Sequence, residues 1–156
     1  RRQRQMCIRD SLPFVVFAEE INFLCKGEET KYIEGDPSSK RVTTKVIGIQ
    51  IYQVGMRLDG EWFDNKKDLT DDYLLEGTYT KTKNKISSAR EFSTNSLIKN
   101  SKIQIIKIDK VEINTLTNNI YWGHEFNRKD ISEEQVKAIY DFRKIFKGIC
   151  KKKGGA

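Results

Sequence analysis

The chain has 156 residues, a formal net charge of +7 at neutral pH and a pI of about 9.3. This length predicts a single domain that can bury a core. The single histidine excludes a metal site with two histidine ligands, and two cysteines, those left without Cys7, cannot form a structural zinc site alone. There is no phosphate loop, nucleophile elbow or dinucleotide fingerprint. The sequence therefore predicts an architecture rather than a reaction, and we expect no cofactor and no metal.

The first segment, Arg1–Ser11 (RRQRQMCIRDS), resembles the conceptual translation of a transposase-type sequencing adapter, and we expect it not to be native. The alternative is the basic n-region of a signal peptide. Four arginines and one aspartate give this segment a net charge of +3, so the rest of the chain carries +4, most of it on Lys151–Lys153. The remaining charge gives little indication of a nucleic-acid partner, and none is expected.

Leu12–Ala18 (LPFVVFA) is apolar but short, since a helix needs about 20 residues to cross a bilayer. Small residues near its end fit the positions that a signal peptidase reads. We interpret it as the truncated end of a signal peptide that is cleaved after Ala18, which predicts a periplasmic or secreted protein. The alternative is a first strand from Phe14 into Phe23. No later segment is predicted to span a membrane.

The native domain is expected at residues 19–150, followed by a basic flexible tail at 151–156. Its two cysteines, Cys25 and Cys150, lie near its two ends. An even pair in an exported protein favours a disulfide. Such a bridge would close a loop of more than a hundred residues, worth about 4–5 kcal/mol in the chain-entropy model. The alternative is two buried reduced thiols.

The first half of the domain reads as strands. Ile21–Lys26 alternates and predicts a first strand, while Lys40–Leu58 is apolar on both faces and predicts a long central or barrel-closing strand. Asp59-Gly60 is typical of a two-residue hairpin turn that returns through Glu61–Phe63.

A charged segment follows, Asp64–Asp72, which lacks the ligand spacing of a calcium loop and is expected to be a solvated loop. Tyr73–Lys81 and Lys85–Phe92 predict two further strands with one wet face. Ser93–Ser101 is expected to be a polar connection.

The densest run of β-forming residues is Lys102–Phe126, which predicts a central hairpin that turns at Thr117–Asn119. Its apolar residues change phase along the first strand. Because a one-residue slip moves side chains to the other face, we expect a β-bulge or second turn at Asp109-Lys110.

Asp130–Lys147 has helical spacing of apolar residues, and Ser132–Gln135 fits a capping box. We therefore expect one C-terminal helix, with a short strand at Ile149-Cys150. The predicted fold is mainly β: one antiparallel curled sheet or small barrel of six to eight strands with this helix.

Aromatic side chains on the predicted strands have two interpretations. They either line a cavity for a small apolar ligand or fill the core. His124, the sole histidine, is a general base in one interpretation and a structural residue in the other. The candidate binding residues are Trp62, Tyr73, Tyr79, Tyr121, Trp122 and His124.

Three short motifs carry a family resemblance: Leu24–Gly27 (LCKG), Val111–Tyr121 (VEINTLTNNIY) and Gly148–Lys152 (GICKK). With them, the chain resembles small exported bacterial β-rich proteins of unknown function. The resemblance implies export and a β-rich fold, but no activity and no functional residues.

We therefore predict a non-catalytic binding or structural module in the cell envelope or outside the cell, with a small apolar ligand or an envelope protein as partner. One alternative is a lipocalin-like carrier of a small apolar ligand inside the barrel, which requires an empty cavity. The other is a hydrolase that uses His124.

Overall fold

The structure is a computed structural model, and it describes residues 20–132 and 134–153. The expectations for the adapter-like segment, the signal peptide and its cleavage after Ala18 lie outside these residues. The prediction of a mainly β, antiparallel fold is confirmed, since every regular element of the described residues is a strand. The strands are β1 (Ile21–Ile33), β2 (Asp36–Ile51), β3 (Gly55–Leu58), β4 (Glu61–Asp64), β5 (Lys66–Thr70), β6 (Tyr73–Lys81), β7 (Lys85–Ile98), β8 (Ser101–Asn114), β9 (Asn119–Asp130) and β10 (Lys137–Lys152).

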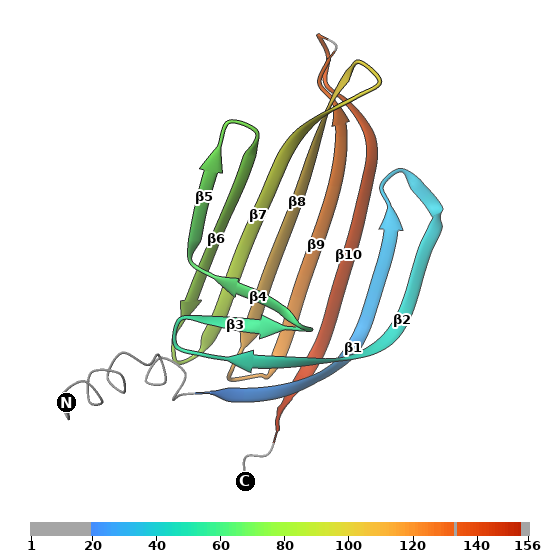
Figure 1. The fold of residues 1–156 in the computed structure, drawn as a ribbon. Coiled ribbons are helices and arrows are strands. Elements are labelled where there is room, and N and C mark those ends of the chain that lie inside the picture. The colour runs from blue at the N-terminus through green and yellow to red at the C-terminus, as the bar shows by residue number, and fades with distance from the viewer. Residues whose placement is uncertain (1–19, 133, 154–156) are drawn as a thin grey trace, which may run out of the picture.

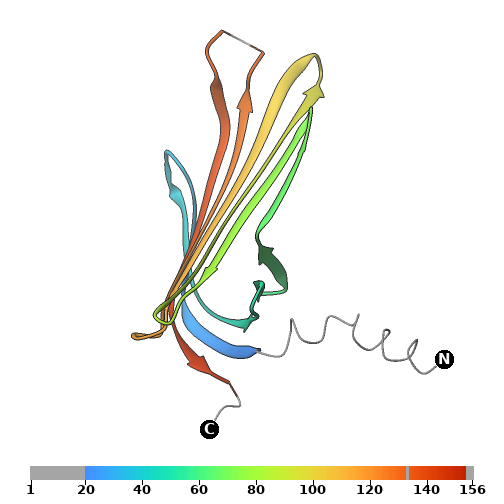
Figure 2. The same cartoon turned by 90° about the vertical axis from the view of Figure 1, so that its left-hand side faces the viewer.

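All ten strands belong to one sheet in the order β4-β3-β2-β1-β10-β9-β8-β7-β6-β5. Neighbours in the sheet are also neighbours in the chain, except that β1 pairs with β10 and so brings the two ends of the chain together. The sheet is strongly coiled, and β3 and β4 cross in front of the lower ends of β6 to β8 (Figures 1 and 2).

Contacts between the two ends of the sheet nearly close it into a barrel. Asn65, just after β4, accepts a hydrogen bond from the Tyr79 amide at 2.8 Å and donates one to the Tyr79 carbonyl at 3.2 Å. Gly77 permits this approach, because a Cβ there would lie 2.5 Å from the carbonyl oxygen of Asp64. The lower half is therefore almost closed, whereas the upper half stays open between β5 and β6 on one side and β1 and β2 on the other (Figure 1).

The lower half holds the apolar core. Because side chains alternate between the faces of a strand, one set of side chains from every strand except the fully exposed β5 points inward. The largest fully buried side chains are Phe63, Phe146, Ile47, Ile49, Ile51, Met56, Leu58, Ile86, Ile113 and Cys25.

The predicted disulfide is confirmed. Cys25 on β1 and Cys150 on β10 are directly paired in the sheet, with Cα atoms 3.9 Å apart, and their sulfur atoms are bonded. The bridge spans a sequence separation of 125 residues and lies in the core. It fixes the strand pair that joins the two ends of the chain.

The predicted C-terminal helix over Asp130–Lys147 is wrong. β9 continues to Asp130, and β10 pairs with β9 and β1 along most of its length. Ser132, read as a helix cap, instead accepts a hydrogen bond from the Lys102 amide beside the β9–β10 turn. The same residues also alternate at period two, and two open strand edges supply the hydrogen bonds that a helix would have made internally. Ile149 and Cys150 belong to this long strand.

The count of six to eight strands is also too low. Lys40–Leu58 divides into β2 and β3, and the predicted loop Asp64–Asp72 contains β5. In Ser93–Ser101, β7 runs on to Ile98 and turns at Lys99-Asn100, whose φ angles of 48° and 67° are those of a tight hairpin turn.

No bulge occurs at Asp109-Lys110, because the pairing of β8 with β7 and β9 is continuous there. The apolar phase changes because Lys107 and Asp109 occupy inward positions. By contrast, the hairpin of β8 and β9 is confirmed, and so is the Asp59-Gly60 turn, where both residues have positive φ (49° and 88°).

Candidate functional site

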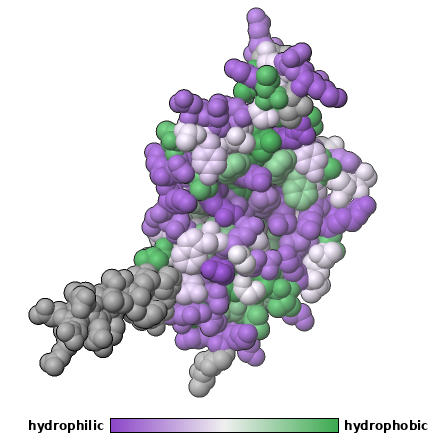
Figure 3. Space-filling view, in the orientation of Figure 1, coloured by the Kyte–Doolittle hydropathy of each residue, from purple (hydrophilic) through white to green (hydrophobic). Residues whose placement is uncertain are grey.

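An open groove of about 710 Å³ lies on the concave face, above the filled core. In the upper half of this face, pale and green side chains are surrounded by purple ones (Figure 3). The groove is lined by one leucine, by aromatic residues and by charged or titratable residues. These are Leu75; Tyr73, Phe92, Trp122, Phe126, Tyr140 and Phe142; and Glu61, Arg90, Lys107, Asp109, His124 and Lys144.

The register of β7 to β10 arranges these residues in layers. Val111, Trp122 and Phe146 are paired across β8, β9 and β10 and close the top of the core. One inward step higher, the paired residues are Arg90, Asp109, His124 and Lys144. The next inward step brings Phe92, Lys107, Phe126 and Phe142 together. The period of two along each strand thus places a charged layer between an apolar core and an aromatic layer.

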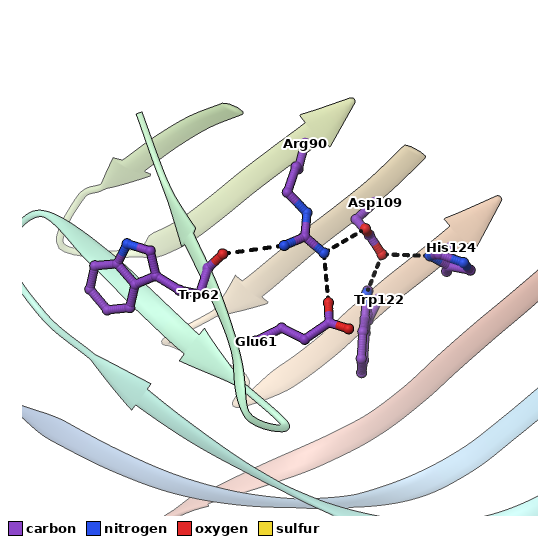
Figure 4. A network of polar contacts seen from close by, with 6 residues as sticks. All are labelled: Glu61, Trp62, Arg90, Asp109, Trp122 and His124. Atoms are coloured by element: carbon purple, nitrogen blue, oxygen red, sulfur yellow. Dashed lines mark hydrogen bonds and ion pairs between the residues drawn. The ribbon is translucent and has the colours of Figure 1, made fainter. Parts of the chain in front are cut away.

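Asp109 is the centre of the charged layer, and its side chain is only 4% exposed. Its Oδ1 accepts a hydrogen bond from Trp122 Nε1 at 3.2 Å and lies 2.8 Å from His124 Nδ1, while its Oδ2 lies 3.0 Å from Arg90 (Figure 4). Burial alone would raise the pKa of Asp109, but the hydrogen bonds from His124 and Arg90 outweigh burial and lower it. The carboxylate is therefore charged and fully partnered.

Arg90 connects this layer to β4. Its guanidinium donates to Glu61 at 2.6 Å and to the Trp62 carbonyl at 3.3 Å, and it stacks over the Phe63 ring at 4.2 Å. Burial would lower the pKa of Arg90, yet its hydrogen bonds to Glu61 and Asp109 raise it. We call Glu61, Arg90, Asp109 and His124 the polar floor of the groove.

Above the polar floor lies an aromatic cluster of Tyr73, Phe92, Phe126, Tyr140 and Phe142. Its ring pairs have centroids 5.2 Å apart (Tyr73–Phe92), 5.9 Å apart (Phe126–Tyr140) and 6.4 Å apart (Tyr140–Phe142). Unlike the core residues, all five are partly exposed. Partly exposed aromatic rings gathered in a concavity are typical of a binding site.

Two lysines stand beside this cluster. Lys107 Nζ lies 5.6 Å and 5.8 Å from the centroids of Phe92 and Phe126, and Lys144 Nζ lies 4.9 Å from the Trp122 ring. These distances are those of cation–π contacts. Among the described residues, neither lysine has a carboxylate within 4.0 Å of its Nζ.

The structure brings three of the predicted binding residues to the groove: Tyr73, Trp122 and His124. Tyr79 is buried in the core, where its hydroxyl donates to the Tyr52 carbonyl and burial raises its pKa to about 12. Tyr121 is 41% exposed on the convex face. Trp62 packs against Tyr52 outside the groove.

Sequence reasoning missed most of the groove. The helix predicted over Asp130–Lys147 concealed the alternation of Tyr140, Phe142 and Lys144 on β10. The β-bulge or turn predicted at Asp109-Lys110 likewise concealed the inward positions of Lys107 and Asp109 on β8. An inward polar residue inside an apolar strand was the available signal, because such positions in real proteins concentrate at functional sites.

Comparisons with protein-family models, with curated proteins and with solved structures each returned no match. The resemblance to small exported bacterial β-rich proteins therefore stays a prediction. Within the described part of the chain, no group of three or more metal-ligating side chains lies together. The same residues contain no helix of the length and apolarity needed to cross a membrane.

Proposed function

We propose that this protein is a non-catalytic binding module that holds a small ligand with an apolar body in the concave groove. The observation that carries the proposal is the partly exposed aromatic cluster above a polar floor whose buried carboxylate, Asp109, is fully partnered. The volume of about 710 Å³ falls within the range of about 300–1,000 Å³ that is usual for small-molecule sites.

A ligand in this groove is bound differently from the ligand of a carrier protein, which lies inside a closed barrel. Such a carrier needs an empty interior, whereas apolar side chains fill the lower half of this sheet. The groove instead lies above this core, on the concave face of β6 to β10, in the half of the sheet that is not closed (Figure 2).

Export is part of the proposal and is supported by the Cys25–Cys150 disulfide, since such bonds persist in oxidising compartments. Expression with a complete signal peptide, followed by intact-mass analysis, tests it. Loss of everything before Glu19, with two thiols that react only after reduction, is the expected result. A retained N-terminus with freely reactive thiols would contradict export.

The binding proposal is tested with phenylnaphthylamine, a neutral dye that fluoresces in apolar sites. We expect saturable binding to the protein and at least about tenfold weaker binding to Phe126→Ala, which removes a ring from the aromatic cluster. Tyr121→Ala is the matched control, because Tyr121 lies on the same strand but on the convex face. Absence of saturable binding, or an equal loss in both variants, would contradict the proposal.

A hydrolase is the second candidate, because His124 Nδ1 lies 2.8 Å from a buried carboxylate, as in sites where a carboxylate orients a catalytic histidine. In the described part of the chain, the His124 ring has one hydrogen-bond partner, Asp109. If an ester or amide substrate is found, His124→Ala would abolish its turnover under this hypothesis. Undiminished turnover would remove the hypothesis.

A further inference from the structure

We propose that the ligand is an organic anion: a flat apolar body that lies on the aromatic cluster, with one acidic group bound by Lys107 and Lys144. This inference rests on the proposed binding function and adds the chemical class of the ligand. It follows from how the charges that line the groove are partnered.

The charges of the polar floor are already used within the floor. Arg90 forms ion pairs with both Glu61 and Asp109. The two carboxylate oxygens of Asp109 are hydrogen-bonded to Trp122, His124 and Arg90. A ligand that competed for Asp109 would have to break the hydrogen bonds of a buried carboxylate, which is costly, and one that competed for Arg90 would have to break its ion pairs with Glu61 and Asp109. The polar floor therefore supports the site but does not supply its free charge.

Lys107 and Lys144 supply that free charge. They stand on β8 and β10, on either side of β9, and both line the groove. Lys144 contributes to the lowered pKa of Glu29, but Glu29 is already paired with Lys31 and Lys45 at 3.3 Å. Two ammonium groups thus line one cavity, and each makes cation–π contacts with aromatic rings.

This arrangement discriminates among ligand charges. An anion would gain charge-assisted hydrogen bonds from both lysines in a site partly shielded from water. A neutral ligand would gain only the apolar contact. A cationic ligand, which aromatic rings alone would attract, would meet two positive charges that already occupy faces of the Phe92, Phe126 and Trp122 rings. The groove therefore selects for an anion with an apolar body.

The test compares two dyes that share the same aromatic body, neutral phenylnaphthylamine and the anion anilinonaphthalene sulfonate. We expect the protein to bind the sulfonate at least about tenfold more tightly, with an advantage that declines as salt is added. In Lys107→Gln/Lys144→Gln, the affinity for the sulfonate should fall to that for the neutral dye. The affinity for the neutral dye should change less than about twofold.

Lys110→Gln/Lys147→Gln is the matched control, since it removes the same charge from the same two strands. Both residues are exposed, and strand alternation places them on the convex face. This variant should keep the preference for the sulfonate. Equal binding of the two dyes by the native protein, or loss of the preference in both double variants, would overturn the anion inference. Failure of both dyes to bind would instead overturn the proposed binding function.

Discussion

Asp109 shows at the scale of one residue how the groove is built. A carboxylate is costly to remove from water unless it is paired and hydrogen-bonded. The structure meets this need from three strands, with Arg90 on β7 and with Trp122 and His124 on β9 around Asp109 on β8. The residue therefore links strand pairing to the shape of the polar floor.

The lowered pKa of Asp109 predicts a specific dependence of stability on pH. Its folded pKa lies below the value of about 3.9 for an unfolded chain. Between these two values the unfolded chain binds a proton that the folded protein does not, so stability rises with pH. The contribution is fully present above the unfolded pKa and is lost as the pH falls through the folded pKa.

Urea unfolding between about pH 2 and pH 6 measures this effect. Asp109→Asn should unfold more easily at neutral pH, by about 1–3 kcal/mol, and should lose less of its remaining stability on acidification. Glu112→Gln, which removes an exposed carboxylate that pairs with Lys85, is the control and should behave as the native protein does. An unchanged acid dependence in Asp109→Asn would show that Asp109 is not responsible.

At the scale of elements, the sequence predicted correctly those strands and turns that are determined by their own residues. Tyr73–Lys81 is β6 with the expected bounds. Asp59-Gly60 forms the predicted hairpin turn, between β3 and β4, because two consecutive positive φ angles suit these residues. β10 was mistaken for a helix because its pattern satisfies both periods. The strand is favoured because β1 and β9 each offer β10 a free edge for pairing. β1 lies more than a hundred residues before β10, so the local sequence does not reveal it.

The disulfide joins β1 to β10, so its removal should lower the stability of this strand pair and of the fold. Reduction, or the Cys25→Ala/Cys150→Ala variant, should lower the free energy of unfolding by about 2–5 kcal/mol, since a long loop of the unfolded chain is then no longer closed. Denaturant titration with and without reductant measures the loss. Reductant should have no further effect on the double variant, and an equal effect on both proteins would contradict the account.

At the scale of the whole molecule, the groove exists because the sheet closes at one end and stays open at the other. Its lining comes from β4 and from β6 to β10. No short stretch of sequence contains this set, which is why Tyr73, Trp122 and His124 were anticipated but Phe92, Phe126 and Phe142 were not. The alternation of each strand was readable, whereas the coiling that brings the strands around one cavity was not.

Closure of the lower half is testable through two glycines. Gly77→Ala should destabilise the fold, because its Cβ would meet the Asp64 carbonyl at 2.5 Å where the two ends of the sheet approach each other. Gly48→Ala should be neutral or slightly stabilising, because a Cβ there meets nothing within 4 Å. Thermal unfolding of the two variants measures the difference, and equal stability would contradict the described closure.

If a ligand binds in the concave groove, a crystal structure of the protein with anilinonaphthalene sulfonate will show the dye there. We expect the ring body against Phe92, Phe126 and Phe142, with the sulfonate within hydrogen-bond distance of Lys107 and Lys144. A dye bound on the convex face, in the hollow beside Tyr121 and Ile149, with the groove empty, would contradict it.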